Sequence, residues 1–303
     1  MLTAIPLLAE LAPVAERLFD RHVATAKEWF PHELVPYGQG RDFQPGEVWD
    51  EASSTVPDAV RSALYVNLLT EDNLPYYFHS ISKLFGEDNP WGAWARRWTA
   101  EEGRHSIVIR DWLTVTRTLD PVWLERGRMH QMCVGFDDSD LPSSMDGLVY
   151  VALQELATRV SHRNTGKLLD DPCAYEIMSR VAADENLHYL FYKDLVTAGL
   201  ELDPSATVCA IDRQVRTFEM PGTGIIDFQR HAMAIARAGI YDFSLHHDQV
   251  LVPVVLRQWG LESIEGLDAE AEQARERALR HMSRLRRAAD RFVEKRARDS
   301  VSA

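Results

Sequence analysis

Cysteine is scarce in this chain and shows no pattern. The sequence holds three cysteines, Cys133, Cys173 and Cys209, and no Cys-x-x-Cys pair. An odd number without paired spacing argues against a disulfide framework and favours a reducing, cytoplasmic compartment. The missing pairs also argue against a structural zinc site built on thiolates.

Long apolar runs are also missing. The longest, from Leu251 to Leu256, is far shorter than the roughly 20 residues of a membrane-spanning helix, and charges interrupt the others. The first residues have apolar positions at helical spacing but carry Glu10 and Glu16 instead of a basic leader. This pattern predicts an amphipathic helix and not a secretory signal. We therefore expect a soluble protein with no transmembrane segment.

Positive charge is in short supply. Lys and Arg number 33 against 46 Asp and Glu, which gives a formal net charge of −13. A broad nucleic-acid surface needs clustered basic residues, so the composition argues against nucleic acid as a partner. The exception is the segment from Arg275 to Arg298, which is strongly basic and is most simply a solvated last helix.

Apolar residues recur at helical spacing throughout, and no strand alternation is convincing. The pattern predicts helices over residues 5–29, 57–85, 91–118, 121–133, 144–168 and 172–199, followed by shorter ones and the basic helix. Four helix starts are written as Asn or Asp before Pro, at residues 89, 120, 171 and 203. The irregular stretch 31–56 resembles a wrapping loop more than a linker, so we expect one domain over 1–303.

The motif Glu-x-x-His occurs twice, as Glu102 with His105 and as Glu185 with His188. Each pair places a carboxylate and an imidazole on one face of a helix. One such pair is expected by chance, but an isolated glutamate precedes each pair at nearly the same distance, so that the halves repeat. These glutamates are Glu71 and Glu155. Both lie among apolar residues, where an unpaired carboxylate is expensive to bury and a cation compensates it.

A glutamate from each of two helices and a Glu-x-x-His from each of two others form the ligand set of ferritin-like di-metal bundles. The sequence therefore predicts an all-α, ferritin-like bundle with a four-helix di-iron core and additional helices. Four glutamates, two imidazoles and no thiolate suit two iron ions, while manganese stays possible. Asp72 and Glu101 are immediate neighbours of proposed ligands and stay open as alternatives.

At these residues the sequence resembles the soluble acyl-[acyl carrier protein] desaturases, and their actinobacterial branch in particular. The similarity covers nearly the whole chain. It is carried in order by HELVPYGQGRDF, TEDNLP, RWTAEEGRH, QELATRVSHRNTGK, ADENLH, FEMPG and GIYD.

The resemblance implies a homodimer whose di-iron centre is reduced by ferredoxin and uses dioxygen to desaturate an acyl chain on acyl carrier protein. It implies that Thr158 helps to manage oxygen and that Asp184 hydrogen-bonds a ligand histidine, His105. We also expect three residues near the acyl tunnel: Tyr76, Tyr77 and Leu84. The basic last helix, with Arg284, Arg286 and Arg287, is a candidate docking face for the acidic carrier protein.

The sequence departs from the family pattern at several points. Gly103 replaces a usual asparagine, which suggests close backbone approach or an altered pocket. Leu187 stands where a basic residue is common. Tyr37 lies in the region where the family has an electron-transfer tryptophan, and we name it as the candidate for that role. The connection between Glu71 and Glu102 is short, so the substrate tunnel is expected to differ.

Other functions use the same bundle. A carrier-linked di-iron hydroxylase or N-oxygenase is one alternative. A ribonucleotide reductase small subunit is another, although Ile109 stands four residues after His105, where that class stores its tyrosyl radical. A ferritin-like iron-storage protein is a third, from outside the enzymes, and would assemble into shells.

Overall fold

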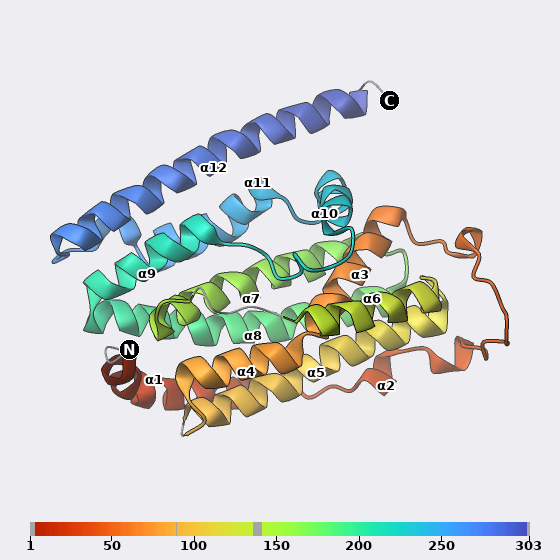
Figure 1. Cartoon of the computed structure of the whole chain (residues 1–303), viewed down its shortest axis with the longest axis horizontal. Coiled ribbons are helices and arrows are strands. Elements are labelled where there is room, and N and C mark those ends of the chain that lie inside the picture. Colours follow the sequence, from red (N-terminus) through yellow and green to blue (C-terminus); the bar gives the residue numbers. More distant parts are fainter. Residues whose placement is uncertain (1–3, 89, 136–140, 302–303) are drawn as a thin grey trace.

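The computed structural model describes residues 4–88, 90–135 and 141–301, and these residues form helices and connections without a strand (Figure 1). The predicted all-α class is therefore confirmed. The α-helices are α1 (Ala4–Thr25), α2 (Pro31–Leu34), α3 (Asp58–Glu71), α4 (Leu74–Phe85), α5 (Trp91–Thr116), α6 (Pro121–Val134), α7 (Ser144–Lys167), α8 (Pro172–Leu202), α9 (Pro204–Thr217), α10 (Phe228–Arg237), α11 (Phe243–Leu245) and α12 (Ala269–Val301).

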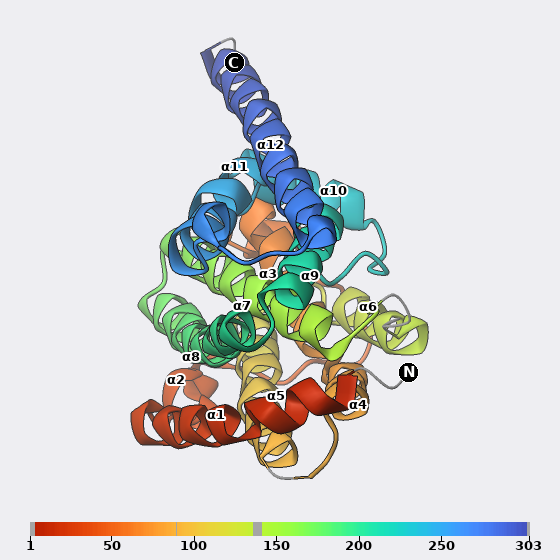
Figure 2. The same cartoon turned by 90° about the vertical axis from the view of Figure 1, so that its left-hand side faces the viewer.

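Helices α3, α5, α7 and α8 form the central bundle, in which α7 and α8 share the most extensive contact. Helices α1 and α4 pack against it from outside (Figures 1 and 2). The buried apolar residues fall into two groups. One lies around Trp94 and Leu153, and the other around Leu68 and Val108. The Glu-x-x-His motifs fall between these two groups, so a polar layer separates two hydrophobic cores.

The expected helix over 57–85 is divided into α3 and α4 at Asp72 and Asn73. Asn73 has ψ near 4°, outside the helical range, and Pro75 in the first turn of α4 has no N–H to continue the α3 ladder. The break leaves Glu71 at the last position of α3. The first helix also ends earlier than expected, at Thr25, so the chain is extended before Trp29.

Three of the four expected Asp-Pro helix starts are present. The side chains of Asp120, Asp171 and Asp203 accept backbone N–H bonds at the starts of α6, α8 and α9, as N-caps do. The fourth start named Asn89, which lies outside the described residues. Helix α5 begins at Trp91, after Pro90. Residues 31–56 wrap the bundle with α2 and two short 3-10 turns, η1 (Tyr37–Gln39) and η2 (Glu51–Ser53).

After α9 the chain forms an outer layer that ends in α12 (Figure 2). This layer contains a π-helix, η3 (His246–Gln258), and a 3-10 turn, η4 (Leu261–Ser263). Buried Asp212 on α9 anchors α12 by accepting from Arg277 at 2.9 Å and also pairs with Arg216. Among the described residues, none of the helices has the length and apolar character needed to cross a bilayer.

Candidate metal centre

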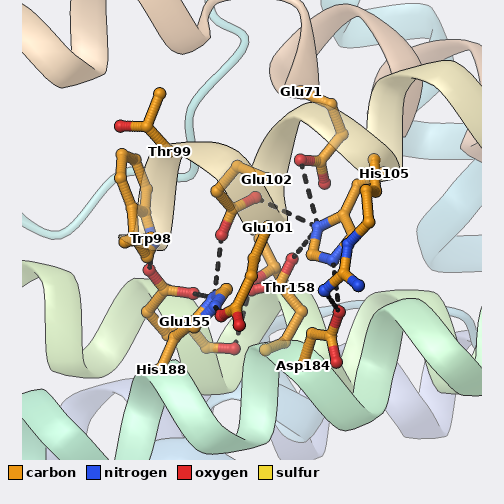
Figure 3. Close-up of polar contacts among 12 residues, drawn as sticks. Glu71, Trp98, Thr99, Glu101, Glu102, His105, Glu155, Thr158, Asp184 and His188 are labelled. Atoms are coloured by element: carbon orange, nitrogen blue, oxygen red, sulfur yellow. Dashed lines mark hydrogen bonds and ion pairs between the residues drawn. The ribbon is translucent and has the colours of Figure 1, made fainter. Parts of the chain in front are cut away.

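The six predicted ligands come from four different helices, and their donor atoms converge in the middle of the bundle. Figure 3 labels all of them except Glu185. Helix α3 supplies Glu71, α7 supplies Glu155, and α5 and α8 supply one Glu-x-x-His each. All six side chains are at most 7% exposed, and the two imidazoles are fully buried. Such burial is expensive for carboxylates unless cations or protons compensate them.

The donor atoms form two overlapping groups, each with all its atoms within 4.8 Å of one another. The His105 cluster consists of Glu71, Glu102, His105 and Glu185. The His188 cluster consists of Glu102, Glu155, Glu185 and His188. The glutamates of the two Glu-x-x-His motifs belong to both groups. Two cations held here would have Glu102 and Glu185 within reach of both, together with one further glutamate and one imidazole each.

The side chains fit a bound cation. Glu102 Oε1, Glu155 Oε2 and His188 Nδ1 are buried, and none of the three has a hydrogen-bond partner among the described residues. His188 Nδ1 nevertheless lies 2.8 Å from Glu102 Oε1 and 3.6 Å from Glu155 Oε2. Lone pairs that face one another this closely require a proton or a metal ion between them. The donor set is that of a di-metal site with oxygen and nitrogen ligands.

Without a cation, protons take its place. Burial and the charge on Glu185 raise the pKa of Glu155 well above its usual value. Burial alone would lower the pKa of His105 and of His188, but the surrounding carboxylates outweigh it and raise both well above the ordinary range. A cluster without a bound cation would therefore retain protons that a metal displaces.

Asp184 lies where the resemblance places it. Its Oδ2 is 3.4 Å from His105 Nε2 and accepts from Arg104 at 3.0 Å. Burial raises its pKa, but the hydrogen bond to His105 outweighs this and lowers it. Thr158 is one turn after Glu155, and its Oγ1 lies 3.0 Å from Glu185 Oε2.

Trp29, and not Tyr37, is the aromatic residue that contacts Asp184. The Trp29 indole donates from Nε1 to Asp184 Oδ2 at 2.9 Å, and its ring lies parallel to that of His105. Tyr37 is 47% exposed and bonds to Asp111 on the surface of α5. No local sequence signal indicates this contact, because Trp29 is placed by the irregular segment that follows α1.

Three further side chains of the centre were not assigned from the sequence. Glu101 accepts from His188 and from His22, and His162 Nε2 lies 3.1 Å from Glu71 Oε1. Burial lowers the pKa of His162, but hydrogen bonds to Glu185 and Glu71 raise it to about 9. His162 follows Glu155 by two helical turns, so helical spacing could have indicated it. Glu101 had been considered only as an alternative ligand.

An apolar cavity ends on the metal centre. Its wall contains carboxylate groups of both clusters together with residues of α4 and α7, and it is lined by Thr70, Glu71, Tyr77, Ser80, Ile81, Leu84, Trp98, Glu102, Leu141, Tyr150, Val151, Gln154, Thr158, Glu185 and Pro221. Two of the three expected tunnel residues, Tyr77 and Leu84, thus line it. The third, Tyr76, points elsewhere, to the backbone oxygen of Met132.

A second, more polar cleft shares Leu141, Tyr150 and Pro221 with the cavity and continues it toward the surface between the end of α6 and residues 217–224. Of the two suggestions for Gly103, close backbone approach is not borne out, while an altered pocket stays a prediction. A Cβ at that position would meet only Leu74, at an ordinary 3.8 Å, so close backbone approach does not require a glycine there.

Comparison with known proteins agrees with this geometry. The family model described as fatty acid desaturase matches residues 3–303. The chain is 40% identical over 300 residues to the Mycobacterium tuberculosis protein named "Putative acyl-[acyl-carrier-protein] desaturase DesA1", covering 96% of this chain and 88% of that protein. The chain belongs to the acyl-[acyl-carrier-protein] desaturase family.

Other members of the desaturase family show the same likeness. The stearoyl-[acyl-carrier-protein] 9-desaturase 6 of Arabidopsis thaliana chloroplasts is 31% identical over 284 residues, covering 88% of this chain and 72% of the plant protein. The X-ray structure of DesA2 from Mycobacterium tuberculosis superposes with a TM-score of 0.69 at 30% identity, covering 89% of this chain and 99% of that one. The desaturase fold therefore spans the helices that carry the metal centre.

Proposed function

We propose that this family member is a di-iron desaturase that introduces a double bond into an acyl chain carried on acyl carrier protein. The observation that carries the proposal is the apolar cavity that ends on Glu71, Glu102 and Glu185. A chain in this cavity would present a methylene pair to the metals, and orientation would select the carbons that react. Two iron ions there would supply the reduction of dioxygen that drives removal of two vicinal hydrogens.

The overall reaction has a simple balance. Two carbon-hydrogen bonds are lost and one carbon-carbon double bond forms, while dioxygen takes up these two hydrogens, two electrons and two protons to give two water molecules. The protein's part is to hold the chain, exclude bulk water and orient the ligands. Thr158, which lines the cavity and contacts Glu185, is the hydroxyl best placed to guide a proton at the metal face.

The electrons are proposed to come from ferredoxin, a small acidic protein. A surface cleft beside Trp29 and Asp184 is lined by Lys27, Arg159, Arg163 and Arg180. Burial and the neighbouring charge of Arg163 lower the pKa of Arg159, and neither of these two arginines has a carboxylate partner in the described structure. This free positive charge in an acidic chain favours an acidic donor near Trp29.

The donor site can be tested with the double variant Arg159→Glu, Arg163→Glu. We expect the KM for ferredoxin to rise at least about tenfold at low salt, because two attractive charges become repulsive. Activity with a small chemical reductant should be unchanged. Arg257→Glu, on the outer layer, is the control. An unchanged ferredoxin KM would exclude this cleft.

Reconstitution tests the activity itself. Purified protein with ferrous iron, ferredoxin, its reductase and acyl carrier substrates of several chain lengths should yield olefins, detected as a loss of two mass units in the released acyl chain. A gain of 16 mass units would identify a hydroxylase instead. If neither product forms across common chain lengths, the desaturase proposal fails. Size-exclusion chromatography separately tests the proposed homodimer against a ferritin-like shell.

The carrier docking face is also open to test. On α12, Arg286 already pairs with Asp248 and Asp290, whereas Arg284 has no ion-pair partner in the described structure. Changing Arg284, Arg286 and Arg287 to glutamate should weaken the affinity for acyl carrier protein if α12 is the docking face. An unchanged affinity would move the docking site to another face.

A further inference from the structure

His22, in the last turn of α1, lies far from the six ligands in sequence and next to them in space. The ring is 3% exposed, and Nε2 lies 2.8 Å from Glu101 Oε2. The edge of the Trp94 ring contacts it at 5.0 Å between centroids, and the His188 ring stacks on it at 5.8 Å. Its position is therefore fixed on several sides.

Glu101 connects His22 to the His188 cluster. Its Oε2 also lies 3.0 Å from His188 Nε2, while Arg97 donates to its other oxygen, Oε1, at 2.7 Å. One buried carboxylate oxygen thus accepts from two imidazoles, and each must carry its proton on Nε2 to donate. His22 Nδ1 has no partner in the described structure, as expected for this tautomer.

This arrangement determines which nitrogen of His188 can bind a metal. With the Nε2 proton held by Glu101, the Nδ1 lone pair faces Glu102 and Glu155. A hydrogen bond from the distal nitrogen to a carboxylate fixes the tautomer and the ring orientation of a metal-binding histidine. Without His22, Glu101 would lose one of the two donors to Oε2 and could turn toward Arg97, at the more exposed end of the site.

The other half of the centre is built in the same way. Asp184 precedes Glu185 and reaches across to His105, just as Glu101 precedes Glu102 and reaches across to His188. Trp29 donates to Asp184 as His22 donates to Glu101. The N-terminal segment therefore supplies one ring to each carboxylate, and the two rings differ in chemistry.

We propose that His22 is a positioning residue for the metal site of the His188 cluster and acts through Glu101. The inference rests on the metal centre of the proposed function and goes beyond it, because it makes α1 part of one metal site and not of the other. Loss of the His22 donor should weaken the binding of the metal ion at the His188 cluster and leave the ion at the His105 cluster in place.

Two variants separate the hydrogen bond from the bulk of the ring. His22→Phe keeps a ring against Trp94 and His188 but removes the donor. His22→Gln keeps an N–H donor at a similar reach. His231→Phe is the matched control, since His231 is similarly buried, at 2% exposed, and its hydrogen bond within the described structure goes to Ser62, outside the centre.

The measurement is anaerobic titration with ferrous iron, followed by Mössbauer spectroscopy of the ⁵⁷Fe-loaded protein. Wild type and His231→Phe should bind two equivalents. His22→Phe should keep one tight equivalent and bind the second about 10- to 100-fold more weakly, with one altered quadrupole doublet. His22→Gln should restore the second equivalent.

Two tight equivalents and an unchanged spectrum in His22→Phe would overturn the inference. If that variant does not fold by circular dichroism, Glu101→Gln decides, since it removes the acceptor charge without changing the size of the side chain. If the Glu101→Gln variant still binds two equivalents of iron tightly, the proposed role of His22 and Glu101 is equally refuted. Wild-type protein that binds no iron would instead refute the metal centre and the proposed function.

Discussion

Iron binding should displace protons from the buried cluster, and their number can be estimated from the structure. The pKa values of His105, His188 and Glu155 are all raised well above their usual values in the metal-free protein. Each of these groups should therefore keep its proton to a higher pH than the free side chain does. Two ferrous ions bound to these groups should therefore release about two to three protons.

The sign and size of the pH dependence follow. Each proton released strengthens binding tenfold per pH unit, or about 1.4 kcal/mol. The product of the two iron affinities should therefore rise by about 100- to 1,000-fold per pH unit near neutrality and fall as the solution is acidified. Isothermal titration in buffers with different ionisation enthalpies counts the protons directly.

The metal-free protein should behave in the opposite way. Groups whose folded-state pKa is raised stabilise the fold at low pH, and this contribution is lost as pH rises toward the folded-state pKa. Glu71, Glu101 and Asp184, whose pKa values are lowered, contribute stability that is already complete above about pH 6. His246, whose pKa is lowered to about 4, contributes with the opposite sign, and its contribution is largely complete by pH 7. The Tm of the metal-free protein should therefore fall from pH 7 to 8, while the increase in Tm on adding iron grows.

One variant tests the proton count and one serves as its control. The Glu155→Gln variant cannot hold this proton and should release about one proton fewer than wild type on binding iron. Glu201 is exposed, so the Glu201→Gln variant should release as many protons as wild type. Iron binding that releases no protons, or a metal-free Tm that rises with pH over this window, would refute the electrostatic account of the centre.

Three further predictions concern packing, the outer layer and the hydroxyl at the metal face. Gly127→Ala places a Cβ inside the volume of the buried Tyr65 side chain and should lower stability by about 1–3 kcal/mol in urea unfolding, while Gly38→Ala, with open space around it, should not. Asp212→Asn removes the charge that anchors α12 and should lower the free energy of unfolding by about 2 kcal/mol. The loss should be no larger, because both partner arginines are partly exposed to solvent. Faster proteolysis of α12 is the measurement. Thr158→Val should bind two irons normally yet consume more reductant per olefin formed, so an unchanged ratio would remove Thr158 from the chemistry.

The part of the centre that follows from local geometry could be predicted from the sequence. A Glu and a His three residues apart share a helix face whatever the rest of the fold does, so the pairs at 102 and 185 were recognisable. Glu71 and Glu155 could be identified because each precedes its Glu-x-x-His pair at nearly the same distance. The helix starts at Asp120, Asp171 and Asp203 were likewise local, since an N-cap acts within one turn.

The residues that orient these ligands depend on long-range packing, which no local pattern encodes. His22 reaches the centre because α1 packs against α8 and α5, and Trp29 reaches it because α1 ends at Thr25. The expected helix 5–29 would have placed Trp29 on a helix face. Tyr37, the candidate named from the resemblance, lies at the surface for a related reason. The resemblance located a region of sequence, while the packing of a neighbouring segment decided that the Trp29 ring faces Asp184.

The two clusters have the same kinds of ligands, but the residues that surround them differ. The His105 cluster is backed by an indole next to the cleft that contains Arg159 and Arg163, where we propose that electrons enter. The His188 cluster is backed by a buried imidazole and by Trp98, whose Nε1 donates to Glu155. The acyl cavity reaches carboxylates that belong to both clusters and is lined by α4 and α7, and it shares no lining residue with the cleft beside Trp29. The proposed electron donor and the proposed acyl chain would therefore approach the centre through different openings.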